Sequence, residues 1–416
     1  MPHSGPKIYL VDVTNRDGVQ TSRICLAKLE KTIINVMLNR MGVHRSEFGF
    51  PFTLHEINYL NANLELQELG ALKPIILSGW CTVRPQDIER SFALVPKLKH
   101  INISISTSDI MIKGKFAGAK TRQDVVDMML CALKVCKENG VAATGVNAED
   151  ASRTDLNFLI EFAVKARENG ASSFRYCDTL GYDDPATIYD RSRKIAETVK
   201  LPVELHCHND LGMAVACSVA GAMGAVDGGQ DAHINTCVNG MGERAGNADL
   251  ISVILALRKS SGWGKRNVLD EKINLSYAWQ ICKYASYAFR VPIPINQPGV
   301  GANAFAHESG IHADGALKDR RNYELYDYEE LGRGEPELVE TGRQITVGQY
   351  SGVKGFRNVY DRLEVEFKDD KQATELLELV RYANVHTQKP LTNEELRFIA
   401  QYPAQARKIL TVAPPE

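Results

Sequence analysis

Apolar, strand-like runs recur eight times along the first part of the chain, and a stretch with helical periodicity follows each of them. Short apolar runs between turn-forming residues are typical of buried strands. Strands that alternate with helices indicate a parallel sheet, because parallel neighbours are joined by a crossover segment. The eight runs are Ile8–Thr14, His44–Phe50, Pro74–Trp80, Ile101–Thr107, Val141–Asn147, Ser172–Thr179, Pro202–His208 and Asp231–Val238.

The segments between these runs have amphipathic patterns, clearest in Arg122–Asn139, Asp155–Asn169 and Pro185–Val199. Lys-Glu-Asn-Gly and Arg-Glu-Asn-Gly, ending at Gly140 and Gly170, predict helix C-termini before the next strand. Strand–helix units repeated over about 250 residues predict a TIM (β/α)8 barrel. A doubly wound open sheet is the alternative fold.

The alternation stops after about residue 262. Trp263–Pro298 predicts a loop and a helix, after which prolines interrupt regular structure. Further helices are expected at 355–367, 370–384 and 392–402. We therefore expect a catalytic barrel at 1–262, a linking subdomain at 263–318, and a smaller, mainly helical C-terminal subdomain at 319–416.

Composition narrows the class of protein. The net charge of −2 in 416 residues gives no electrostatic reason to expect nucleic acid or an anionic membrane as partner. No apolar run approaches the roughly 20 residues that span a bilayer, and the N-terminus lacks the apolar core of a signal peptide. The nine cysteines form no CxxC pair, which favours reduced thiols in a cytoplasm over a disulfide framework.

Unusual polar residues cluster at the expected C-terminal ends of the strands, where TIM barrels carry out their chemistry. They are Arg16 and Asp17 after the first strand, Glu47 on the second, Glu149 and Asp150 after the fifth, Asp178 and Thr179 on the sixth, His206 and His208 on the seventh, and Asn239 and Glu243 after the eighth.

His206 and His208 are separated by one residue, and residues i and i+2 of a strand point to the same face. With Asp17 they make one carboxylate and two imidazoles, a set that suits a divalent ion with open positions. Such an ion would polarise a chelated ketone. The alternatives are a pair of ordinary surface or core histidines, and the ligand set of an iron oxygenase.

Four further side chains have both a chemical and a structural interpretation. Arg16 would stabilise an enolate or alkoxide oxygen, or form a salt bridge. Thr179 would bind a carboxylate, or cap a turn. Arg175 and Glu204 have the strand parity of the barrel interior, and we favour an ion pair between them. The alternative is that Arg175 or Arg84 meets the distal carboxylate of a dicarboxylic 2-oxo acid.

Five segments together resemble the signatures of the metal-dependent acyl-CoA condensing barrels. They lie at 12–20 (Asp-Val-Thr-Asn-Arg-Asp-Gly-Val-Gln), 148–155, 206–213, 239–247 and 310–312 (Gly-Ile-His). The family includes isopropylmalate, homocitrate, citramalate and Re-type citrate synthases, with hydroxymethylglutaryl-CoA lyase as a lyase relative. The resemblance runs in order from residue 8 to about 360.

The resemblance implies a role for each matching residue. A divalent metal (Mn²⁺, Mg²⁺, Co²⁺ or Zn²⁺) would be bound by Asp17, His206 and His208, with Asn247 in or near its shell. The proton of the acetyl-CoA methyl would be taken by a group made of Glu149, His312 and Tyr323. Arg16 and Glu243 complete the expected catalytic set. The residues expected to bind substrate are Arg16, Glu47, Arg84, Arg153, Arg175 and Thr179.

The resemblance also implies an activity and a partner. The enzyme would be an acyltransferase that condenses acetyl-CoA with a 2-oxo dicarboxylic acid and hydrolyses the thioester. Oxaloacetate, giving citrate, is favoured, because segments 12–20 and 239–244 look most like those of the Re-type citrate synthases. The alternative enzymes are, in order, homocitrate synthase, isopropylmalate or citramalate synthase, and an acyl-CoA lyase. A non-catalytic metal-binding protein is a further alternative.

In homocitrate synthases of this family the histidine and tyrosine reach over from the partner subunit, so a homodimer is expected here. Three positions depart from the family pattern: Val19 stands where Glu is usual, Met111 where His is usual, and Val146-Asn147 where Phe-Ser is frequent. These positions lie near the expected substrate pocket and therefore bear on the choice of acceptor acid.

Overall fold

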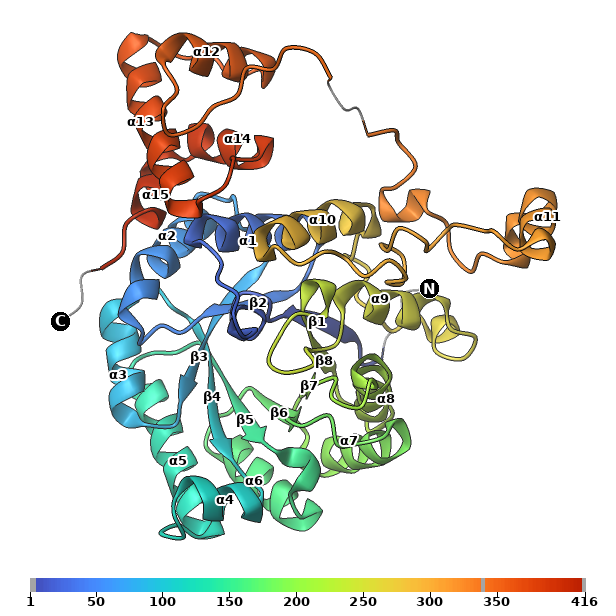
Figure 1. Cartoon of the computed structure of the whole chain (residues 1–416). Helices are drawn as coiled ribbons and strands as arrows, with labels where there is room; N and C mark the ends of the chain where they lie inside the picture. Colours follow the sequence, from blue (N-terminus) through green and yellow to red (C-terminus); the bar gives the residue numbers. More distant parts are fainter. Residues whose placement is uncertain (1–4, 338–340, 414–416) are drawn as a thin grey trace.

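Eight parallel strands close into a barrel in the N-terminal part of the chain (Figure 1). The computed structural model describes residues 5–337 and 341–413. The barrel contains β1 (Ile8–Asp12), β2 (Arg45–Gly49), β3 (Ile76–Thr82), β4 (His100–Ser106), β5 (Ala143–Glu149), β6 (Ser173–Asp178), β7 (Val203–Cys207) and β8 (Ala232–Thr236). Since β8 pairs with β1, the predicted (β/α)8 barrel is confirmed and the open sheet is excluded.

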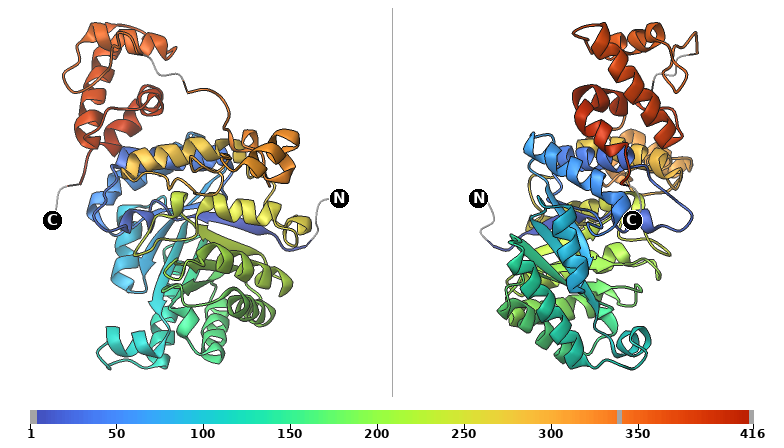
Figure 2. Two further views of the ribbon diagram at one scale, coloured as in Figure 1. Left: turned by 45° about the vertical axis from the view of Figure 1, so that its right-hand side comes forward. Right: turned by 90° about the vertical axis from the view of Figure 1, so that its left-hand side faces the viewer.

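Helices form the outer layer of the barrel (Figures 1 and 2). They are α1 (Lys28–Met41), α2 (Ile57–Glu68), α3 (Pro85–Leu94), α4 (Asp109–Lys115), α5 (Arg122–Glu138), α6 (Leu156–Glu168), α7 (Pro185–Val199), α8 (Ala214–Asp227) and α9 (Leu250–Lys259). Because helices cover the strands outside and side chains fill the barrel inside, β6 and β7 are buried along their whole length.

Local signals place the helix ends as the sequence predicts. Gly140 and Gly170 follow α5 and α6 with φ of +68° and +93°, a conformation that glycine adopts without a steric penalty. At the other end of α5, the Thr121 side chain accepts from the backbone N–H of Asp124 and completes a capping box. These caps satisfy backbone groups that the helix itself leaves unpaired.

The C-terminal part is mainly helical, as predicted. It contains α10 (Ala278–Phe289), α11 (Gly310–Lys318), α12 (Val353–Arg362), α13 (Asp370–Thr387), α14 (Asn393–Gln401) and α15 (Pro403–Ile409). α10, α13 and α14 contact α1, and α15 contacts α2. Figure 1 shows α11 at the end of an extended segment, away from the barrel.

The prediction of the C-terminal helices was wrong in three details. The Gly-Ile-His stretch forms α11, and α15 was not foreseen. The helix expected to reach residue 367 ends at Arg362, and Glu364 then adopts a φ of +59°. The boundaries proposed at 262 and 318 stay predictions. None of the helices in residues 5–337 and 341–413 combines the length and apolar character needed to cross a membrane.

Short 3₁₀ turns complete the chain, and several carry polar residues of the barrel mouth. They are η1 (Gly18–Gln20), η2 (Leu54–Glu56), η3 (Ala151–Arg153), η4 (Val238–Gly240), η5 (Gly264–Arg266), η6 (Leu275–Tyr277), η7 (Arg320–Asn322) and η8 (Glu329–Leu331). The turns η1, η3 and η4 follow β1, β5 and β8, at the C-terminal ends of the strands.

Candidate metal and substrate site

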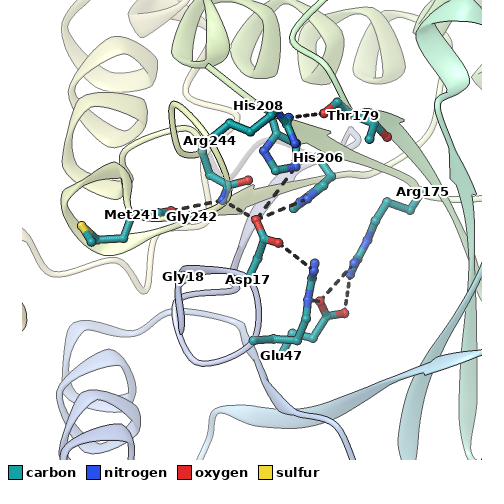
Figure 3. Close-up of polar contacts among 12 residues, drawn as sticks. Asp17, Gly18, Glu47, Arg175, Thr179, His206, His208, Met241, Gly242 and Arg244 are labelled. Atoms are coloured by element: carbon teal, nitrogen blue, oxygen red, sulfur yellow. Dashed lines mark hydrogen bonds and ion pairs between the residues drawn. The ribbon is translucent and has the colours of Figure 1, made fainter. Parts of the chain in front are cut away.

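Asp17, His206 and His208 converge at the C-terminal mouth of the barrel (Figure 3). Asp17 lies in the turn after β1, His206 is on β7, and His208 follows its last residue. Asp17 Oδ2 lies 3.9 Å from Nε2 of each imidazole. One ligand atom from each residue fits within 4.8 Å of the others, and all three residues are buried. The three side chains could therefore hold one metal ion between them.

The protonation states of the three side chains suit a cation. Burial lowers the pKa of both His206 and His208, so the imidazoles are neutral, the form in which histidine coordinates metals. Burial raises the pKa of Asp17, but the charge of Arg16 and the hydrogen bond from Asn247 act against burial, and that pKa is lowered to about 2. A carboxylate and two neutral imidazoles are donors for a divalent ion.

Asn247 lies beside this group, as its place in the sequence motif implies. Its Nδ2 donates to Asp17 Oδ2 and to the Met241 carbonyl, while its buried Oδ1 has no hydrogen-bond partner in the described part of the chain. A Cβ at Gly242 would lie 2.0 Å from Asn247 Nδ2. Glycine at 242 therefore leaves the space in which Asn247 reaches Asp17.

A chain of alternating charges fills the barrel behind the three ligands. Arg16 pairs with Asp17 and with Glu47, and Arg175 joins Glu47 to Glu204. The predicted Arg175–Glu204 ion pair is thus present, with 2.9 Å between Nη2 and Oε2. All three guanidinium nitrogens of Arg175 contact Glu47 or Glu204. Arg175 therefore pairs with the protein's own carboxylates and has no guanidinium nitrogen left without such a contact.

A cavity of about 490 Å³ opens above this group. Nine of the residues expected at the site line it: Arg16, Asp17, Arg84, Glu149, Arg175, Thr179, His206, His208 and Glu243. Glu47 and Asn247 do not line it, and each supports a residue that does. The cavity volume falls within the range of small-molecule sites.

Thr179 and Arg153 belong to one hydrogen-bonded loop, but only Thr179 faces the cavity. The Thr179 hydroxyl accepts from the backbone N–H of Asp150, at 2.9 Å. Arg153 forms an ion pair with the Asp150 carboxylate, at 2.8 Å between Nη2 and Oδ2, and does not line the cavity. In the structure Arg153 thus holds the loop after β5.

Glu149 has a partner that the sequence did not suggest. Lys115 Nζ lies 2.6 Å from both oxygens of the Glu149 carboxylate, and Ser106 Oγ donates to Oε2. Lys115 also lines the cavity. No motif or strand position marks this lysine, because its place depends on how the helix after β4 folds back over the mouth.

Arg244 is a second residue that sequence reasoning missed. It lines the cavity, donates to both oxygens of Asp210 and also donates to the Thr179 carbonyl. The loops after β6, β7 and β8 are thereby joined. Figure 3 shows the contact between Arg244 and Thr179. Its position next to Glu243 in the segment 239–247 was an available signal.

His312 and Tyr323 lie together but outside the cavity. Their rings stack at 4.2 Å between centroids, with 23° between the planes. Both side chains are exposed, and neither lines the cavity of their own chain. The structure therefore pairs these two residues with each other but does not bring them to Glu149.

Comparisons with known proteins agree with this fold. Residues 7–284 match the HMGL-like family, and residues 300–387 match the family described as homocitrate synthase post-HMGL domain-like. The chain is 57% identical to citrate (Re)-synthase of Dehalococcoides mccartyi, over 98% of this chain and 99% of that protein. It is 39% identical to 2-isopropylmalate synthase 2 of Caldanaerobacter subterraneus, with 94% of each covered.

More distant relatives keep the same architecture. Homocitrate synthase 1 of a Nostoc species is 33% identical over 94% of this chain and 96% of its own. Among solved structures, hydroxymethylglutaryl-CoA lyase from Pseudomonas aeruginosa superposes with a TM-score of 0.54 at 14% identity, covering 76% of this chain and all of that one (100%). At such low identity the likeness concerns the fold alone.

Proposed function

The chain belongs to the HMGL-like family, and on that premise we propose that it is an acyltransferase that condenses acetyl-CoA with oxaloacetate to give citrate and CoA. The observation that carries the reaction class is the convergence of Asp17, His206 and His208 in a cavity large enough for a small acid. The choice of oxaloacetate is supported by the 57% identity to a citrate (Re)-synthase.

A divalent ion (Mn²⁺, Mg²⁺, Co²⁺ or Zn²⁺) would be held by Asp17, His206 and His208, with Asn247 beside it. Bound there, it would act as a Lewis acid toward the ketone of the oxo acid. The neutral imidazoles, the charged aspartate and the unpaired Asn247 Oδ1 support this assignment. Thr179 supplies a hydroxyl for the carboxylate next to the ketone.

Glu149, with His312 and Tyr323, takes a proton from the acetyl methyl. The methyl carbon then forms a bond to the ketone carbon, and the ketone oxygen accepts a proton. Arg16 stabilises the negative charge that develops on oxygen, since its guanidinium is always charged and Glu47 and Asp17 hold it at the cavity. Water cleaves the thioester, CoA leaves as the free thiol, and Glu243 is available in the cavity for that step.

We further propose a homodimer in which the His312–Tyr323 pair of each chain reaches the cavity of the other. The pair is exposed on α11 and the loop after it, and large apolar neighbours share that exposure, with Ile311 77%, Leu317 88% and Leu325 71% exposed. Exposed apolar surface of this kind is typical of contact with another protein chain. Within one chain His312 and Tyr323 do not reach Glu149, and this also supports a site shared between two chains.

The proposed enzyme works in the cytoplasm on small molecules, without nucleic acid or membrane as a partner. All nine cysteines are free thiols, as expected in a reducing compartment.

A thiol-release assay with acetyl-CoA tests the function. Oxaloacetate is expected to give the highest kcat/KM among oxaloacetate, 2-oxoglutarate, 2-oxoisovalerate and pyruvate, and a chelator is expected to abolish the release. Homocitrate synthesis from 2-oxoglutarate is the second candidate, favoured by the family match of residues 300–387. Thiol release with none of the four acids would reject the proposal.

A further inference from the structure

The proposed acceptor carries two carboxylates, and the cavity must supply a partner for the second one. In the proposed function, Thr179 and the metal site take the carboxylate next to the ketone. The cavity is lined by five cationic side chains: Arg16, Arg84, Lys115, Arg175 and Arg244. This inference rests on the proposed function and asks which of the five meets the distal carboxylate.

Four of these cations pair with acidic side chains of the protein, and three of the four are each held by two residues. Arg16 is paired with Asp17 and Glu47. Arg175 directs every guanidinium nitrogen to Glu47 or Glu204. Arg244 pairs with Asp210 and also donates to a backbone carbonyl. Moving Arg16 or Arg175 onto a substrate would leave a buried carboxylate unpaired, which is costly.

Two cations remain: Arg84, and Lys115, whose ion-pair partner is the single residue Glu149. Arg84 is exposed at the N-cap of α3, and its guanidinium has no ion pair within the described residues. Among the residues that the structure describes, no polar contact joins Arg84 to the loop of Thr179. Lys115 is tied to that loop, because its partner Glu149 directly precedes Asp150, whose N–H donates to the Thr179 hydroxyl. Lys115 therefore lies on the acceptor's side of the cavity.

The contact between Lys115 and Glu149 also bears on catalysis. A carboxylate has about four acceptor positions on its two oxygens. Lys115 and Ser106 together occupy three of them on Glu149. In this arrangement little of the Glu149 carboxylate is left to receive a proton from carbon. Glu149 would become available if Lys115 moved to another anion.

The helix that carries Lys115 has the freedom for such a movement. α4 has seven residues, of which only Ile112 is buried. The Lys115 side chain is 50% exposed. A segment with few buried apolar contacts shifts at low energetic cost. The long lysine side chain reaches several positions from one backbone location.

We propose that Lys115 is a specificity-determining residue that binds the distal carboxylate of the 2-oxo dicarboxylic acid. In binding the acid, its ammonium group leaves Glu149 and frees that carboxylate to act on acetyl-CoA. Binding of the oxo acid thus frees Glu149 to act as the base. An acid without a distal carboxylate leaves Lys115 on Glu149.

The test compares Lys115→Met with Lys113→Met, a matched change at an exposed position of the same helix. Loss of a charge-assisted hydrogen bond in K115M is expected to raise the KM for oxaloacetate about 10- to 100-fold, with the KM for acetyl-CoA changed by less than about twofold. K113M keeps both constants, and Lys115→Arg recovers part of the loss. A rise confined to acetyl-CoA, or no rise at all, overturns the proposal.

Binding is measured separately from turnover. Isothermal titration calorimetry of oxaloacetate, with Mn²⁺ present and acetyl-CoA absent, is expected to give a Kd raised by a similar factor in K115M. Arg84→Met serves as the comparison at the other candidate cation, and a larger loss there than in K115M overturns the assignment. If wild-type protein releases no thiol with any oxo acid, the proposed function fails. If wild-type protein does release thiol and K115M behaves like wild type, only the inference about Lys115 fails.

Discussion

Glu47 shows how a buried side chain supports a site without lining the cavity. It is fully buried and accepts hydrogen bonds from Arg16, Arg175 and Asn102. Burial raises its pKa, but the charges of Arg175 and Arg16 lower that pKa to about 2. The carboxylate is therefore charged at every working pH, and it sets the direction in which Arg16 faces the cavity.

Glu47→Gln is expected to lower the free energy of unfolding by about 3 kcal/mol, because two buried guanidinium groups then lose half of their compensating charge. The midpoint of urea denaturation measures this change. Glu89→Gln, at an exposed position of α3, is the control and is expected to leave the midpoint unchanged. Equal midpoints for E47Q and wild type would mean that Glu47 is not needed to hold the arginines.

Replacement of a metal ligand gives a second prediction. His208→Ala removes one of three donors and is expected to weaken Mn²⁺ binding about 10-fold or more, as measured by calorimetry on protein treated with chelator. His55→Ala, an exposed histidine far along the sequence from the three ligands, is the control. Tight Mn²⁺ binding by H208A would show that the ion is held elsewhere.

The strands also carry a histidine cluster at the opposite end of the barrel. Tyr9, His44 and His233 lie at the starts of β1, β2 and β8, with ring centroids 4.8 to 5.7 Å apart. Burial and the nearby Arg45 charge lower the pKa of His233 to about 3. The folded protein therefore keeps this imidazole neutral, while an unfolded histidine titrates near 6.5.

Acid is expected to destabilise the barrel through His233. Stability from a lowered histidine pKa is complete above pH 6.5 and falls as the pH drops toward 3, by at most about 1.4 kcal/mol per pH unit. Urea denaturation between pH 5 and 7 checks this. Asp12, whose pKa burial raises to about 7, acts in the opposite direction. The Asp12 contribution is the same in wild type and in His233→Asn, so it cancels when their unfolding free energies are subtracted. That difference in unfolding free energy should grow with pH. A difference that does not change with pH contradicts the prediction.

The strands were predicted from the sequence more completely than the helices. The alternation of apolar runs identified all eight strands, since burial on both faces leaves an uninterrupted apolar signal. Asn-Gly at 139–140 and 169–170 identified two helix ends. The helix α11 was missed, because its nine residues include two glycines and too few large apolar residues to show a helical period; none of its residues is buried in this chain.

The exposed α11 connects this chain to a second copy in the proposed dimer. Asp17→Ala and His312→Ala are each expected to inactivate the enzyme, yet a mixture refolded together should regain about a quarter of the wild-type activity. Half of the dimers are then mixed, and one of their two sites is intact. Thiol release after mixing measures this.

No recovery in the mixture would contradict the shared site and leave His312 acting within its own chain or not at all. The control is a mixture of Asp17→Ala with His208→Ala. Both changes affect the same cavity, so no exchange of subunits restores an intact site. Sedimentation of each variant confirms that dimers have formed before activity is compared.

The sequence by itself determined the eight strands, most of the helices and the donor chemistry. Strand period, helix period and capping residues depend on only a few neighbouring positions, so they can be recognised from the sequence without a structure. The same local rule put His206 and His208 on one face, since they are two residues apart on one strand.

Only the tertiary structure decided which distant side chains meet. Arg175 reaches Glu47 across 128 positions of sequence, and Lys115 reaches Glu149 across 34. Such contacts depend on barrel closure, on strand register and on the need of each buried charge for a partner. No local pattern encodes these three conditions, because they arise when the strands and helices pack together.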